Sequence, residues 1–127
     1  MSRPDLLAIL DLTLLDRGAT EHDIRQIVNL AAKHGVAAAC VFSEHVGLAR
    51  EIARPETRIA AVVDPFPEGS ADLDQYLHSI EDAIARGADE IDLVLEPDIG
   101  VEASMLVLNG VRLATKGRTL KLSLIHI

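Results

Sequence analysis

The chain alternates between short aliphatic runs and longer stretches in which apolar residues recur three and four positions apart. Short continuous apolar runs are typical of buried strands, whereas the wider spacing is typical of a helix with one buried face. The runs predict five strands, over 7–13, 36–42, 58–63, 90–95 and 119–125. The stretches between them predict four helices, so strands and helices alternate with a repeat of about 30 residues, as in parallel crossover units.

The first two helices have recognisable boundary residues. Thr20 is a capping residue for the first helix, and Asp23, three positions later, completes the pattern of a capping box. Gly35 follows the last apolar position of that helix and predicts its end. Ser43 predicts the start of a short second helix that runs to about residue 53.

The third stretch carries the most regular helical stripe of the chain, and the fourth carries the least regular one. The regular stripe consists of Leu73, Leu77, Ile80 and Ile84, and Gly87 predicts its end. The fourth helix, over 102–116, contains Gly110 and has a blurred apolar face.

Two architectures share this alternating pattern. One is an open, doubly wound sheet, which is complete with five strands. The other is a (β/α)₈ barrel, which needs about 250 residues, so that a chain of 127 residues would supply only its first five strands. No glycine-rich phosphate loop follows any strand, but periodicity alone does not decide between the two.

The composition narrows the class of protein. Hydrophobic residues make up 49% of the chain and aromatic residues only 2%, so the core is aliphatic, which suits helices packed on a parallel sheet. The formal net charge of −8 argues against partners such as nucleic acid or an anionic membrane, because both require basic surfaces.

The cysteine and histidine content bears on compartment and metal binding. The single cysteine, Cys40, excludes an internal disulfide and fits a reducing environment. No signal-peptide pattern or apolar run of membrane-spanning length is visible, so we expect a cytoplasmic protein. The five histidines show no ligand spacing, and we expect no metal site.

Three charged residues lie inside predicted strands, each between aliphatic neighbours: Asp11, Asp92 and Lys121. Successive side chains of a strand point to opposite faces, so each charged group points away from its apolar neighbours. Burial of an unpaired charge costs several kcal/mol. We therefore expect the three to converge on one polar pocket; the alternative is three unrelated residues that face water.

Several segments resemble the N-terminal half of deoxyribose-phosphate aldolase, over about residues 7–122. They are DLTLLD (11–16), AAACVFSEHVGLAREI (37–52), VVDPFPEG (62–69) and GADEIDLVLEPD (87–98). That family has the TIM-barrel fold, so the resemblance implies a truncated (β/α)₈ barrel of about five parallel strands and four helices. Residues 1–122 would be the N-terminal part of the aldolase barrel, and 123–127 (SLIHI) leave the family pattern as a foreign tail.

The resemblance also implies a reaction. The family is a class I aldolase that cleaves 2-deoxy-D-ribose 5-phosphate reversibly to glyceraldehyde 3-phosphate and acetaldehyde, in deoxyribonucleotide catabolism. A lysine amine forms a Schiff base with the carbonyl carbon, and no metal or organic cofactor takes part. The implied partner is a small sugar phosphate, and assembly into a homo-oligomer is left open.

The resemblance assigns roles to five residues of this chain. Asp92 matches the strand-four acid that relays protons, and Asp11 matches a strand-one acid of the same polar network. Thr13, Cys40 and Lys121 match residues close to the substrate, although a small buried hydrophobe is an equal reading of the cysteine.

The imine-forming lysine of the family belongs to a later strand, beyond Ile127, so we expect this chain alone to be inactive. The competing interpretation is a non-catalytic α/β module that binds a ligand or assembles through its sheet edges. Five strands of an intended eight leave two open edges, which two copies would cover by pairing.

Overall fold

The computed structural model describes residues 11–123 except 67, 71 and 97. Its strands form one parallel sheet in the order β1-β2-β3-β4-β5. The strands are β1 (Asp11–Leu14), β2 (Ala38–Phe42), β3 (Ile59–Val62), β4 (Glu90–Val94) and β5 (Thr119–Ser123). The predicted strand extensions over 7–10 and 124–125, and most of the predicted foreign tail, lie outside the described residues.

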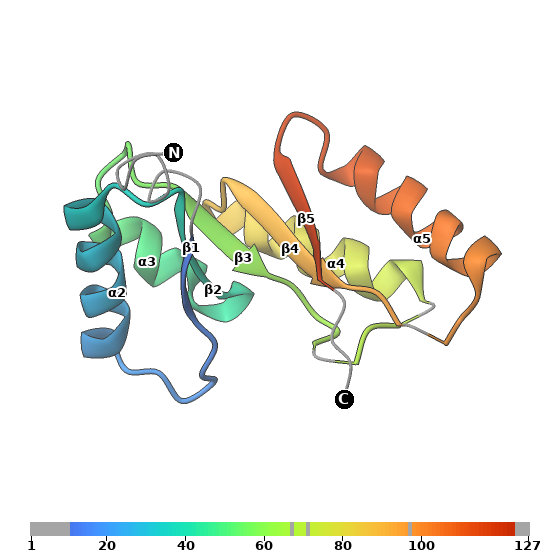
Figure 1. Cartoon of the computed structure of the whole chain (residues 1–127), viewed down its shortest axis with the longest axis horizontal. Helices are drawn as coiled ribbons and strands as arrows, with labels where there is room; N and C mark the ends of the chain where they lie inside the picture. The colour runs from blue at the N-terminus through green and yellow to red at the C-terminus, as the bar shows by residue number, and fades with distance from the viewer. Residues whose placement is uncertain (1–10, 67, 71, 97, 124–127) are drawn as a thin grey trace, which may run out of the picture.

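Four α-helices and one short 3₁₀ helix connect the described strands, and the helices cover one side of the sheet (Figure 1). They are α2 (Glu21–His34), η1 (Ser43–His45), α3 (Val46–Ile52), α4 (Leu73–Arg86) and α5 (Val101–Ala114).

The strand order decides between the two architectures. Each crossover moves the chain by one strand in the same direction, so neighbours in sequence are neighbours in the sheet. A doubly wound sheet reverses direction at a switch point, whereas a barrel wall does not. The sheet is therefore five strands of a TIM-barrel wall, which confirms the predicted fold.

The core lies between the sheet and the helices. Alternate residues of each central strand point to this side, for example Val41, Ala61 and Leu93, and all are fully buried. Ile24 and Val28 of α2 and Ile80 of α4 pack against them. The aliphatic core predicted from composition is thus a single layer between helices and sheet.

The predicted boundaries of α2 and α4 are confirmed. The Thr20 hydroxyl accepts a hydrogen bond from the Asp23 backbone N–H, and the Asp23 carboxylate accepts one from the Thr20 N–H. Gly35 and Gly87 end the two helices with left-handed backbones, at φ 63° and 108°, which favour glycine.

The predicted start of the second helix is wrong. Ser43 begins the 3₁₀ turn η1 rather than an α-helix, and α3 begins at Val46 without a side-chain cap. The chain leaves β2 with extended backbone at Phe42 and makes one tight turn before it can extend as an α-helix.

The structure also shows a purely structural carboxylate. Asp89, just before β4, accepts hydrogen bonds from the Ile59 backbone N–H at 2.8 Å and from Arg50 Nη1 at 2.9 Å. Through these contacts it joins α3 to the start of β3. A structural role of this kind is what the position of Asp89 at the start of a strand indicates.

The blurred apolar face of α5 has a physical reason, because the helix is apolar on both sides. Val107 and Val111 are buried against the core, whereas Val101, Leu106 and Leu113 are 80%, 71% and 77% exposed. Leu122 on β5 is also exposed. In the described part of the chain, no helix combines the length and apolarity needed to cross a membrane.

Shortening a side chain should cost much more stability on the buried face of α5 than on its exposed face. Val111→Ala removes two buried methyl groups and should lower the free energy of unfolding by about 1–2 kcal/mol. Leu113→Ala, two residues away on the exposed side, should change it by less than about 0.5 kcal/mol. Urea titration followed by circular dichroism measures both, and equal losses would contradict this placement of the helix.

Candidate functional site

The site is built on the sheet face opposite the helices. The side chains that point there include Cys40, Phe42, Ala60 and Val62, which form a small buried apolar cluster on β2 and β3. The flanking strands place charged groups on the same face: Asp11 on β1, Glu90 and Asp92 on β4, and Lys121 on β5. On this inner face, the apolar cluster of β2 and β3 is thus flanked by charged side chains of β1, β4 and β5.

Lys121 joins the two edges of the sheet. Its ammonium donates a hydrogen bond to Asp11 Oδ2, although β1 and β5 are the two outermost described strands. The sheet must curl for these side chains to meet, as a barrel wall does. Lys121 Nζ also forms an ion pair with Glu90 Oε1 at 2.9 Å.

Glu90 is the functional candidate that sequence reasoning missed. Its side chain is only 5% exposed, and Oε2 accepts a hydrogen bond of 2.7 Å from Arg58 Nε. The signal was present in the sequence, because Glu90 stands two positions before Asp92 and therefore points to the same face of the strand.

The ionic network shifts the pKa values of its members. Burial by itself lowers the pKa of Lys121, but the carboxylates of Asp11 and Glu90 outweigh burial and raise the pKa above its usual value. Burial would raise the pKa of Glu90, but Arg58 and Lys121 outweigh it and hold that pKa below its usual value. Lys121 and Glu90 are therefore both charged at neutral pH.

The other residues singled out from the sequence gather at the same place. Asp92 stands opposite Lys121 in the register of β4 and β5, and Thr13 stands opposite Cys40 in that of β1 and β2. Burial raises the pKa of the Cys40 thiol to about 12, with a further contribution from the negative charges of Asp92 and Asp11. The charge of Lys121 and a hydrogen bond with Thr13 oppose that shift.

One polar atom of the cluster has hydrogen-bonding capacity that the described residues do not use. Asp11 Oδ1 is buried without a hydrogen bond partner, whereas Glu90 Oε1 lies 2.9 Å from the Lys121 ammonium. Buried oxygens of this kind normally bind a donor from protein, water or ligand. The inner face can therefore accept hydrogen bonds from a polar molecule, such as one with hydroxyl groups.

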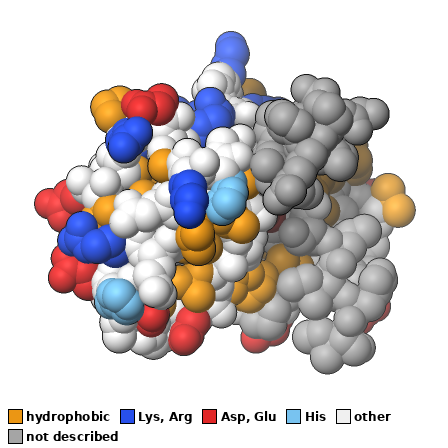
Figure 2. All heavy atoms as spheres, turned by 60° about the vertical axis from the view of Figure 1, so that its left-hand side comes forward, with side chains coloured by type: hydrophobic (Ala, Val, Ile, Leu, Met, Phe, Trp, Pro, Cys, Tyr) orange, Lys and Arg blue, Asp and Glu red, His pale blue; other side chains and the backbone are white. Residues whose placement is uncertain are grey.

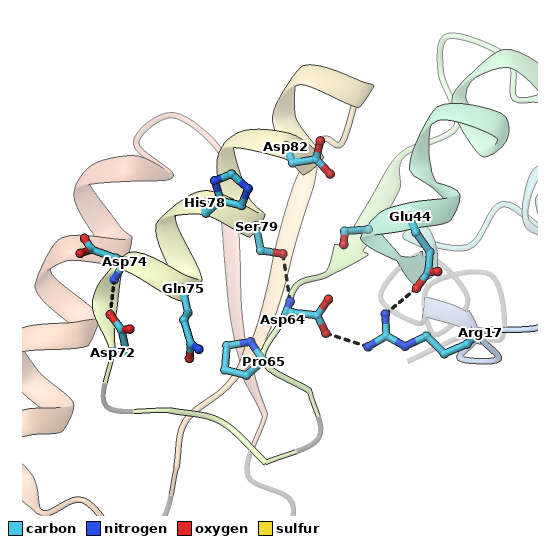
Figure 3. Close-up of a pocket in the computed structure, with 11 residues that line it drawn as sticks. Arg17, Glu44, Asp64, Pro65, Asp72, Asp74, Gln75, His78, Ser79 and Asp82 are labelled. Carbon is cyan, nitrogen blue, oxygen red and sulfur yellow. Dashed lines mark hydrogen bonds and ion pairs between the residues drawn. The ribbon is translucent and has the colours of Figure 1, made fainter.

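A separate hollow of about 920 Å³ lies at the carboxyl ends of β2 and β3, beside α4 (Figure 3). None of the site residues predicted from the sequence lines it. Its lining is mostly acidic and polar: Arg17, Ser43, Glu44, Asp64, Pro65, Asp72, Asp74, Gln75, His78, Ser79 and Asp82. Because these acids are largely solvated or paired, the inner-face cluster with its buried charges is the stronger candidate site.

No group of three or more histidine, cysteine or acidic side chains among the described residues is arranged to hold a metal ion. On the face that Figure 2 shows, basic and acidic side chains of the described residues are interspersed with apolar ones.

No family model matches the chain. A curated deoxyribose-phosphate aldolase from Mycobacterium bovis is 36% identical over 126 residues, which cover 94% of this chain and 54% of that protein. One from Streptococcus pyogenes is 36% identical over 95 residues, which cover 75% of this chain and 42% of that protein.

A solved structure agrees with these sequence relatives. The deoxyribose phosphate aldolase of Aeropyrum pernix, described as a tetramer, superposes with a TM-score of 0.81 at 31% identity over 95% of this chain. Over nearly its whole length, the chain is similar to part of a deoxyribose-phosphate aldolase. It spans about half the length of the aldolases it matches.

The similarity to these aldolases agrees with the geometry of the sheet. The aldolase neighbour is about twice as long, since this chain covers 53% of it, and the five sequential parallel strands correspond to part of its barrel. The charged cluster lies on the face that becomes the interior of such a barrel.

The network predicts a pH-dependent contribution of Lys121 to stability. Lys121→Met leaves Asp11 and Glu90 without their shared cation. It should lower the free energy of unfolding at pH 7 by about 2–3 kcal/mol. The loss is smaller than for a fully buried ion pair, because Lys121 is partly exposed. The matched variant Lys116→Met, on an exposed lysine after α5, should have little effect.

The pH range of this effect follows from the directions of the shifts. Glu90 has a lowered pKa, so its contribution is present above about pH 4.5 and is lost as the pH falls through the lowered value. Lys121 has a raised pKa, so its contribution is present below about pH 10.5 and is lost as the pH rises through the raised value. Urea titrations at several pH values should show the largest difference between the two variants between these limits; a difference independent of pH would contradict the network.

Proposed function

We propose that this chain supplies the first part of the active site of a class I aldolase, which cleaves 2-deoxy-D-ribose 5-phosphate reversibly to glyceraldehyde 3-phosphate and acetaldehyde. The observation that carries the proposal is the partly buried ionic network of Lys121, Asp11 and Glu90, with Asp92 beside it on the inner face. The names of the related aldolases support the same reaction.

In this proposal Asp92 and Asp11 are the acid–base residues. Proton transfer accompanies the formation of the imine and the cleavage of the carbon–carbon bond, and a carboxylate within reach of the reacting atoms can relay those protons. Thr13, Cys40 and Lys121 line the same surface and would contact the sugar phosphate. No cofactor is required, because the imine itself accepts the electron pair.

Lys121 is not the nucleophile in this proposal. An amine attacks a carbonyl only in its neutral form, and nucleophilic lysines usually have a lowered pKa. Lys121 has a raised pKa because two carboxylates stabilise its ammonium form. Its expected role is to hold Asp11 and Glu90 and to position the acids around the substrate.

We therefore propose that residues 1–127 alone are inactive, since the other two lysines, Lys33 and Lys116, are exposed at helix ends. The imine-forming lysine would lie in a later strand of a longer protein, of which residues 1–122 form the first part of the barrel. The same proposal treats 123–127 as a foreign tail and places the protein in the cytoplasm.

A second candidate is a non-catalytic module that assembles with a partner, including another copy of itself. The apolar side chains exposed on α5 and β5 favour it, because they lie at the end of the sheet that has no further described strand. These side chains are Val101, Met105, Leu106, Leu113 and Leu122.

Chemical trapping tests the role of Lys121. Incubation of residues 1–127 with acetaldehyde and sodium borohydride at pH 7, followed by peptide mass spectrometry, should give no more adduct on Lys121 than on the exposed Lys33. Preferential modification of Lys121 would show that it is a nucleophile after all and that this chain has part of the activity.

A chimaera tests the proposed reaction itself. Residues 1–122 joined to the remaining C-terminal part of the Mycobacterium bovis aldolase should cleave 2-deoxy-D-ribose 5-phosphate. Asp92→Asn in that chimaera should lower kcat about 100-fold or more, as expected for loss of a general acid–base group. Asp98→Asn, on an exposed residue after β4, is the control and should not lower it. A folded chimaera without activity would contradict the proposal.

A further inference from the structure

Arg17 reaches two carboxylates at the carboxyl end of the sheet, those of Glu44 and Asp64 (Figure 3), and also an aromatic ring. It lies in the connection between β1 and α2. Its Nη1 donates to Glu44 Oε1 at 2.5 Å, and its Nη2 donates to Asp64 Oδ1 at 2.7 Å. Its guanidinium carbon lies 3.7 Å from the centre of the Phe42 ring.

Arg17 and the residues it contacts come from the ends of three successive strands. Arg17 follows β1, Phe42 is the last residue of β2 with Glu44 two positions later, and Asp64 follows β3. Connections at the carboxyl ends of parallel barrel strands are where barrel proteins form their sites. One planar guanidinium therefore holds together three connections that border the inner face.

The aromatic contact extends this arrangement to the inner face itself. Phe42 points to the same side of β2 as Cys40, two residues earlier, and both belong to the small apolar cluster. The Phe42 ring packs edge-on against Phe66, with ring centres 5.3 Å apart. Arg17 thus stacks on the Phe42 ring at the carboxyl end of the apolar cluster, and Phe66 packs against the same ring.

The contacts of Arg17 are weak enough to break while the rest of the protein stays folded. The side chains of Arg17, Glu44 and Asp64 are 44%, 45% and 51% exposed, and ion pairs at such exposure are individually weak and screened by salt. Asp64 is itself fixed, because its backbone N–H donates to Ser79 Oγ of α4 at 3.0 Å. The connection that carries Arg17 is therefore the part that would move.

We propose that Arg17 is a positioning residue that holds the Phe42–Phe66 pair in place and controls access to the inner-face cluster from the carboxyl end of the sheet. The proposal does not depend on the aldolase reaction. A lysine at this position would keep the charge but lose the two-pronged contact with two carboxylates and the flat stacking on the ring.

Cys40 provides a reporter, because it is the only cysteine of the chain and is 3% exposed on the protected face. The test is the rate at which a small neutral reagent, methyl methanethiosulfonate, modifies Cys40 in residues 1–127, followed by intact-mass spectrometry at pH 8. Arg17 is not among the charges that shift the pKa of Cys40, so a change in rate reports access rather than thiolate fraction.

We expect Arg17→Ala to raise the modification rate about tenfold and Arg17→Lys to raise it less, since two exposed ion pairs and one cation–π contact are lost in the first variant. Sodium chloride should raise the rate of the unchanged protein but not that of Arg17→Ala. Arg25→Ala is the matched control, because Arg25 forms an exposed ion pair with Glu21 on α2, and its rate should not change.

Local opening must be separated from unfolding. The free energy of unfolding of each variant is measured by urea titration, and the rate of modification is measured at low urea concentrations. A rate increase that does not depend on urea supports the proposal, because local opening exposes little surface. The proposal is overturned if Arg17→Ala leaves the rate unchanged, if Arg25→Ala has the same effect, or if the increase equals the change in the unfolding equilibrium.

Discussion

The ion pairs of Lys121 with Asp11 and Glu90 are the interaction on which the inner face depends. They connect β5 with β1 and β4, so they exist only if the sheet is curled and only if all three strands keep their register. A one-residue shift of any strand would turn its charged group toward the helices, into an aliphatic core that cannot solvate it. The network therefore links the chemistry of the site to the alignment of the sheet.

The same network bears on whether Lys121 acts as a cation or as a nucleophile. A lysine held by two carboxylates is a stable cation, suited to hold acids in position, whereas a nucleophilic lysine needs an environment that favours its neutral form. This is why the geometry of this chain supports a role for Asp11 and Asp92 more directly than a role for Lys121 in forming an imine.

The sequence predicted more of the fold than of the site. Short aliphatic runs placed the strands, and the cap at Thr20 with Asp23 and the glycine at 87 marked real helix ends, because these signals are local. The prediction that Ser43 starts an α-helix was wrong, because its capping propensity says nothing about the tight turn by which the chain leaves β2. The patterning did lead to the expectation that Asp11 and Lys121 share a pocket. Strand order, the part played by Glu90 and the contacts of Arg17 could not be predicted from it, since each depends on distant segments meeting in space.

A double-mutant cycle between Asp11 and Lys121 tests the central claim most directly. Asp11→Asn, Lys121→Met and the double variant are unfolded in urea at pH 7, and the coupling free energy is obtained from the four values of the free energy of unfolding. Contact across the curled sheet predicts a coupling of about 1–3 kcal/mol. Additive effects, within about 0.5 kcal/mol, would mean that the two side chains do not meet and that the inner-face cluster does not exist as described.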